Sequence, residues 1–192
     1  MFSVVGETPW EELQEQIRQV PLLLPRGGEL VYPYENARIN LYEIPYAAVR
    51  PTSLYVVSRN LQLQRELAAD LESQGVDPLA LEGMVHIKQD DQPPVGLMPP
   101  IVEHTPAEGM YVLDGLHRSY IGKQAGRLMF RGIHISGIRH DCPAAVYPNE
   151  WSDVIEYTDV PTDPMLKRHY RDHQEQSRRN FAALNGSRPR TS

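Results

Sequence analysis

Residues 110–126 read Met110-Tyr-Val-Leu-Asp-Gly-Leu-His-Arg-Ser-Tyr-Ile-Gly-Lys-Gln-Ala-Gly126, and they contain the clearest indication of the fold. It begins with a short apolar run at residues 110–113, which predicts a strand. Gly115 lets the backbone turn sharply enough for a helix to begin within two or three residues. We therefore expect a strand, a turn and a helix in direct succession, with the helix running from about residue 117 to residue 124.

The start of this predicted helix has the chemistry of a phosphate site. Its first backbone N–H groups and the positive end of its dipole favour an anion, and an adjacent guanidinium can hold two phosphate oxygens. His117 and Arg118 side by side would also repel each other without an anion between them. The predicted phosphate-binding residues are Gly115, Leu116, His117, Arg118 and Ser119.

Asp114 is the residue whose role decides the class of function. Beside bound phosphates, its carboxylate could hold Mg²⁺ or accept a proton from an attacking hydroxyl. It could equally bond the backbone of its own turn, which is common for Asp before Gly. Asp114 and His117 are thus the candidate catalytic residues, and Asp114 is the candidate metal ligand.

The pentapeptide Asp114-Gly-Leu-His-Arg118, in its strand–turn–helix setting, resembles the nucleotide-binding signature of the ParB N-terminal/sulfiredoxin superfamily. Its Asp-Gly-x-His-Arg form is most similar to that of the free serine kinases and of some ParB-domain regulators. The likeness covers roughly residues 40–138. It implies an α+β domain with a mixed sheet, flanking helices and a strand–turn–helix phosphate site. The implied cofactors are ATP or ADP, with CTP as an alternative, together with Mg²⁺.

The function that the resemblance implies first is nucleotide-dependent phosphotransfer, as a kinase acting on an amino acid or a similar small hydroxyl acceptor. The serine kinases add an upstream Glu, which residues 50–58 lack. The base is therefore left open among Glu43, Asp90, Asp91, Glu103 and Asp114. Leu116 stands where sulfiredoxins carry their reactive cysteine, so sulfiredoxin activity is not expected. The alternative is a ParB-like, nucleotide-binding, DNA-associated regulator without its own helix-turn-helix.

Composition agrees with a single globular domain of 192 residues, 41% of them hydrophobic. The N-terminus does not resemble a signal peptide, no apolar run is as long as a membrane span, and Cys142 is the single cysteine, so we expect a cytoplasmic protein without a membrane partner. The net charge of −6 disfavours a nucleic-acid partner. Residues 165–192 nevertheless hold seven Lys or Arg and two Asp or Glu. Oligomeric state is not indicated.

The remaining elements follow from caps, breakers and periodicity. Thr8 is expected to cap a helix at residues 9–19, Gly75 to end one at 60–74, and Asp163 to cap one at 163–184. A short helix is expected at residues 149–156. Strands are expected at residues 30–34 and 39–44, which could form a hairpin, and at 101–103 and 128–138. Residues 77–100 are expected to be a mobile connection over the active site, with one short strand at 84–87. The predicted organisation is one nucleotide-binding domain at residues 1–162, followed by a C-terminal helix and basic tail at 163–192.

Overall fold

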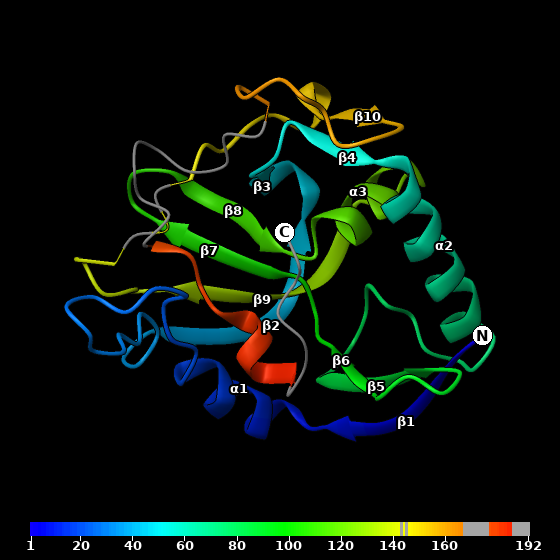
Figure 1. Cartoon of the computed structure of the whole chain (residues 1–192), viewed down its shortest axis with the longest axis horizontal. Coiled ribbons are helices and arrows are strands. Elements are labelled where there is room, and N and C mark those ends of the chain that lie inside the picture. Colours follow the sequence, from blue (N-terminus) through cyan, green and yellow to red (C-terminus); the bar gives the residue numbers. More distant parts are fainter. Residues whose placement is uncertain (143, 145, 167–176, 186–192) are drawn as a thin grey trace.

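A five-stranded mixed sheet forms the centre of the computed structural model, which describes residues 1–142, 144, 146–166 and 177–185 (Figure 1). In spatial order its strands are β2 (Arg38–Pro45), β9 (Met129–Ser136), β7 (Ile101–Thr105), β8 (Gly109–Asp114) and β3 (Val49–Pro51). The pairs β2–β9 and β7–β8 are antiparallel, whereas β7–β9 and β3–β8 are parallel. The predicted α+β class with a mixed sheet is therefore confirmed.

The predicted strand–turn–helix is present, with β8 leading through Gly115 into α3 (Leu116–Gln124). Gly115 has φ +82°, and a Cβ there would lie 2.9 Å from Cβ of Pro100, so glycine is required for both reasons. At Gly122, in the middle of α3, a Cβ would lie 2.4 Å from Cδ1 of Leu79 and 2.5 Å from the hydroxyl oxygen of Tyr46. The helix α3 thus packs closely against Leu79 and Tyr46, which lie beside the sheet.

Both faces of the central sheet are covered by apolar side chains. On one face, Leu13 and Ile17 of α1 (Trp10–Arg18) pack with Ile101 and Ile133. On the other face, Val102 and Val112 form a cluster with Tyr46, Leu79 and Phe130. The alternation of side chains along β7 and β9 assigns neighbouring residues to these two cores.

Two smaller sheets flank the central one. β1 (Phe2–Thr8), β5 (Met84–Gln89) and β6 (Val95–Leu97) form an antiparallel sheet in the order β1-β5-β6. Leu67 and Leu71 of α2 (Ser58–Glu72) pack against it. β4 (Tyr55–Val57) pairs in parallel with β10 (Ile155–Tyr157). The expected strand at residues 84–87 is confirmed, but residues 77–100 are not an open connection, because β5 and β6 pair with each other and with the N-terminal strand.

Several predicted elements are corrected by their partners. Thr8 ends β1 and its hydroxyl lies 2.8 Å from Nε2 of His86, so it does not cap α1, whose N-cap is Pro9. Residues 30–34 form no strand, and β2 pairs with β9 rather than in a hairpin with them. Residues 149–156 contain a short 3-10 helix, η2 (Trp151–Asp153), followed by β10. Helix α2 ends as predicted before Gly75, which has φ +79°.

The helix predicted at residues 163–184 is wrong over residues 163–166 and 177–184, which are not α-helical, and its residues 167–176 lie outside the described ones. Arg179 forms an antiparallel bridge with Leu22, and residues Phe181–Asn185 form a 3-10 helix, η4. The reason is long-range, because Arg179 is buried against Glu103 of the central sheet. Among the described residues, no helix has the length and apolar character needed to cross a bilayer.

Candidate functional site

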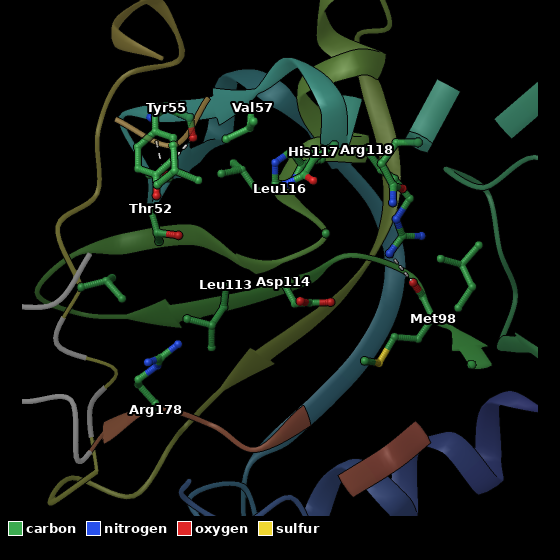
Figure 2. A pocket seen from close by; sticks show the side chains of 18 residues that line it. Thr52, Tyr55, Val57, Met98, Leu113, Asp114, Leu116, His117, Arg118 and Arg178 are labelled. Carbon is green, nitrogen blue, oxygen red and sulfur yellow. Dashed lines mark hydrogen bonds between the residues drawn. The ribbon is translucent and has the colours of Figure 1, made fainter. Parts of the chain in front are cut away.

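A cavity of about 490 Å³ lies at the turn from β8 to α3 (Figure 2). Its wall includes Asp114, Gly115, Leu116, His117 and Arg118, which are five of the six residues singled out from the motif. In Figure 2, Leu113 and Asp114 mark the end of β8, and His117 and Arg118 stand at the start of α3. The structure thus brings these five residues together on one cavity wall.

The backbone geometry at this wall suits an anion. The helical hydrogen-bond ladder of α3 begins with the Ser119 N–H, which donates to Gly115 O at 3.0 Å. The N–H groups of Leu116, His117 and Arg118 precede that bond, at the positive end of the helix dipole. Gly115 adopts a left-handed conformation, which sets the direction in which the chain enters α3.

Arg118 is more buried than its expected role suggests, with 8% of its surface exposed. Its guanidinium donates to Met98 O at 2.8 Å and to Pro78 O at 3.2 Å, which ties the first turn of α3 to the segment after β6 and to the loop that contains Pro78. Burial lowers the pKa of Arg118, while the nearby Asp114 carboxylate acts in the opposite direction. Two of its five donors are therefore used to hold the site together.

Ser119 lies away from the cavity. Its side chain is fully buried, and its Oγ has no hydrogen-bond partner among the described residues. It is not part of the cavity wall. Ser119 therefore differs from the five residues before it, because its hydroxyl is buried and does not face the cavity.

Of the five carboxylates considered as a base, Asp114 is the one that lines the cavity. Glu43 pairs with Arg131 at 3.0 Å on the edge strand β2. Asp90 lies 3.6 Å from the N-terminal amine, and Asp91 is exposed beside it, at the turn between β5 and β6. Glu103 is fully buried in the sheet. Among the described residues, carboxylate chemistry in this cavity therefore depends on Asp114.

Glu103 belongs to a buried network instead. Its Oε1 accepts from Nε of Arg179 at 2.8 Å and from the Tyr34 hydroxyl, and its Oε2 accepts from the Tyr111 hydroxyl at 2.8 Å. The desolvation of burial and the Glu103 charge both raise the pKa of Tyr34 and of Tyr111. The two phenols therefore stay protonated and donate to the carboxylate.

Four polar residues that line the cavity from other elements were not predicted from the sequence: Thr52, Ser53, Asn60 and Gln64. Thr52 and Ser53 reach the cavity because β3 runs parallel to β8 with Pro51 opposite Val112, so the ends of both strands meet at one edge. Thr52 Oγ1 donates to Val112 O at 2.8 Å and fastens the two ends together. Gln64 Oε1 is buried without a hydrogen-bond partner among the described residues.

Arg178 was missed for a different reason. It lines the cavity from the C-terminal segment, as Figure 2 shows, although the sequence predicted a helix over residues 163–184 and no part in the site. Its place depends on the burial of its neighbour Arg179, for which the local sequence holds no signal.

A metal cage made of protein ligands is absent from the described part of the chain, where no three His, Cys, Asp or Glu side chains are grouped for one. Of the residues that the structure describes, Asp114 is the one that brings a carboxylate to the cavity wall. Such a wall suits a metal that takes most of its ligands from a bound molecule and from water.

Comparison with protein families gives a match to the model described as ParB CE domain, over residues 12–155. The matched segment extends from α1 to β10 and includes the β8–α3 turn. Arg178 and η4 lie beyond it. Neither the curated proteins nor the solved structures yield a match to the chain.

Proposed function

This chain belongs to the ParB CE domain family, and from that premise we propose that it binds a nucleotide by its phosphates at the β8–α3 turn. The observation that carries the proposal is the cavity of about 490 Å³ whose wall is formed by residues 114–118. Ligand cavities of this kind commonly have volumes of about 300–1,000 Å³. The volume therefore suits a nucleotide.

Phosphate would be bound by the backbone N–H groups of Leu116 and His117 and by the His117 side chain. Both N–H groups stand at the start of α3, where the helix dipole favours negative charge. Arg118 acts mainly by position, since its guanidinium holds the carbonyl groups of Pro78 and Met98. It keeps the first turn of the helix in place and adds positive charge to the wall.

Mg²⁺ fits this donor set as a companion of the nucleotide. The ion binds through one or two carboxylates, together with phosphate oxygens and water. Asp114 supplies one carboxylate at the wall, and the described residues hold no cage of three ligands. When bound, the ion would neutralise phosphate charge, and Asp114 is the residue that would hold it.

A second candidate is phosphoryl transfer to a small hydroxyl acceptor, as in an amino acid kinase. It is favoured by the position of Asp114, which could accept the proton of an acceptor hydroxyl in the same cavity. In that case one carboxylate would have to serve both the metal and the acceptor, because Glu43, Asp90, Asp91 and Glu103 are elsewhere. For this reason nucleotide binding is proposed first.

In a regulatory role, the protein would act without a helix-turn-helix of its own. The described α-helices α1, α2 and α3 are separated from one another by strands, so they do not form that motif. Association with DNA would then need another basic surface or a partner protein.

The test is calorimetric titration of the protein with ATP, ADP and CTP in the presence of Mg²⁺. Asp114→Asn is expected to weaken Mg²⁺-dependent binding, whereas Asp91→Asn, the same change at an exposed turn, should leave it unchanged. Equal affinity of both variants would remove Asp114 from the site. Absence of binding by any of the three nucleotides would refute the proposed function.

Turnover separates the two candidates. The protein is incubated with nucleotide, Mg²⁺ and a panel of hydroxylated amino acids, and phosphorylated product is followed by mass spectrometry. Acceptor-dependent product that is lost in Asp114→Asn supports the kinase. Nucleotide binding without product, together with salt-sensitive retention on DNA, supports the regulator.

A further inference from the structure

The C-terminal segment at residues 177–185 returns to the central domain and packs beside α1 (Figure 1). Its backbone pairs with an N-terminal loop, because Leu23 N–H donates to Arg178 O at 2.7 Å and Asn180 N–H donates to Pro21 O at 2.9 Å. Phe181 packs against the same core as α1. Three independent contacts thus fix the path of this segment.

Arg179 anchors the segment in the interior. Its side chain is 1% exposed and that of Glu103 is 0% exposed. The guanidinium donates to both carboxylate oxygens of Glu103, at 2.8 and 3.3 Å, and to the carbonyl oxygens of Cys142 and Ser177. Its Nε also donates to the Tyr34 hydroxyl oxygen at 3.2 Å, so five acceptor atoms hold the guanidinium and leave the backbone at residue 179 little freedom.

The neighbouring Arg178 reaches the cavity as a consequence. In an extended segment, successive side chains point to opposite sides, so burial of Arg179 turns Arg178 outward. Arg178 lines the same cavity as Asp114 and His117, and Figure 2 shows it extending from the C-terminal segment toward Leu113. The cavity therefore has a basic side chain on a wall that α3 does not supply.

We propose that Arg178 binds the phosphates of the nucleotide, and that Glu103 and Arg179 are the positioning pair that holds it at the cavity. The proposal rests on the nucleotide-binding function proposed above. Arg178 would place a second group of donors on the anion, facing those at the start of α3, and a guanidinium can bond two phosphate oxygens at once. Both arginines lie beyond the segment that matches the family model, residues 12–155, so this part of the site belongs to the chain's own C-terminal segment.

The first experiment compares Arg178→Gln with the wild-type protein by titration with ATP, ADP, CTP and the corresponding nucleosides. Loss of a charge-assisted hydrogen bond predicts roughly 10- to 100-fold weaker nucleotide binding. Binding of the nucleosides, which have no phosphate, should not change. Arg65→Gln, at an exposed position of α2, removes the same charge and is expected to bind nucleotide as the wild type does. Wild-type affinity in Arg178→Gln would overturn the inference while leaving nucleotide binding intact.

Titration with inorganic pyrophosphate and triphosphate separates the two proposals. If the wild type binds these anions but no nucleotide, and Arg178→Gln loses them, the arginine contact stands and the proposed function fails. If the wild type binds neither nucleotides nor these anions, both are wrong.

The role of the positioning pair is tested by a double-mutant cycle between Glu103→Gln and Arg178→Gln. If Glu103 acts through Arg178, Glu103→Gln weakens nucleotide binding in the wild-type background and has no further effect in Arg178→Gln. A role in stability alone would lower the unfolding midpoint and leave affinity unchanged at a temperature where the variant is folded. Additive losses of affinity would also overturn the positioning role, since they would show that Glu103 acts independently of Arg178.

Discussion

Removing one partner of the buried Glu103–Arg179 pair is expected to destabilise the protein strongly. Both side chains are almost fully buried, so Arg179→Met leaves the Glu103 carboxylate with two phenol donors and no counter-charge. Breaking a buried pair in this way costs about 3–5 kcal/mol of unfolding free energy. For a chain of this size, each kcal/mol corresponds to a shift of about 2–4 °C in the melting temperature. The expected fall is therefore about 6–20 °C.

The assay is urea unfolding followed by circular dichroism, with thermal melts as a second readout. Glu103→Gln, Arg179→Met and the double variant are compared with the wild type. Because the double variant leaves no unpaired charge, it should lose about 1–3 kcal/mol less than the sum of the single losses. The control is Asp141→Asn, which breaks the solvent-exposed Arg139–Asp141 pair and should leave the midpoint unchanged.

Equal losses of stability on breaking the buried and the exposed pair would contradict this prediction. If Arg179→Met lowers the unfolding free energy by less than about 1 kcal/mol, the loss is of the size typical of exposed ion pairs. It would mean that residues 177–185 leave the core in solution, and Arg178 could not then be held at the cavity wall. If the loss of unfolding free energy in the double variant equals the sum of the two single losses, Glu103 and Arg179 do not stabilise each other.

Two further predictions concern buried titratable side chains. The hydroxyl of Tyr46 is buried without a hydrogen-bond partner among the described residues, so Tyr46→Phe should raise the unfolding free energy by about 1 kcal/mol. Burial raises the pKa of Tyr46 to about 12, whereas a tyrosine in the unfolded chain ionises near 10. The wild type should therefore lose stability between about pH 10 and 12. Urea titrations across this range should show a weaker loss of stability in Tyr46→Phe. Equal losses in both proteins would exclude Tyr46 as the cause. Burial, aided by the nearby His104, lowers the pKa of His134. The unfolded chain then binds the proton first, so stability should fall as the pH drops below about 6.5. This loss of stability should be smaller in His134→Gln and unchanged in the exposed control His140→Gln. If His134→Gln loses stability as steeply as the wild type, His134 is not the source of the loss.

The strand–turn–helix could be predicted because its causes are local. The apolar residues before Asp114, the glycine that adopts positive φ and the helix after it are all encoded within seventeen consecutive residues. The structure begins α3 at Leu116, one residue before the predicted start. Helix α2 and its end at Gly75 could be predicted for the same reason.

Elements that depend on distant partners could not be predicted in this way. β1 owes its existence to β5, which is more than 75 residues away in the chain. Residues 177–185 have a helix-like composition, yet Arg179 is drawn into the core by Glu103, 76 residues earlier. The residue types in the motif do not show which side chains are buried. The sequence therefore predicts Ser119 at the phosphate site, whereas in the structure its side chain is fully buried.

The order of synthesis adds a consequence to the buried network. Tyr34, Glu103 and Tyr111 are all made long before Arg179, whose bond to Tyr34 spans 145 residues. Until residue 179 has been synthesised, the sheet holds a carboxylate whose counter-charge does not yet exist, and the stability of the folded state is lower accordingly. A chain released before residue 179 would keep that uncompensated carboxylate, so cellular proteases should remove it far faster than a chain that contains Arg179.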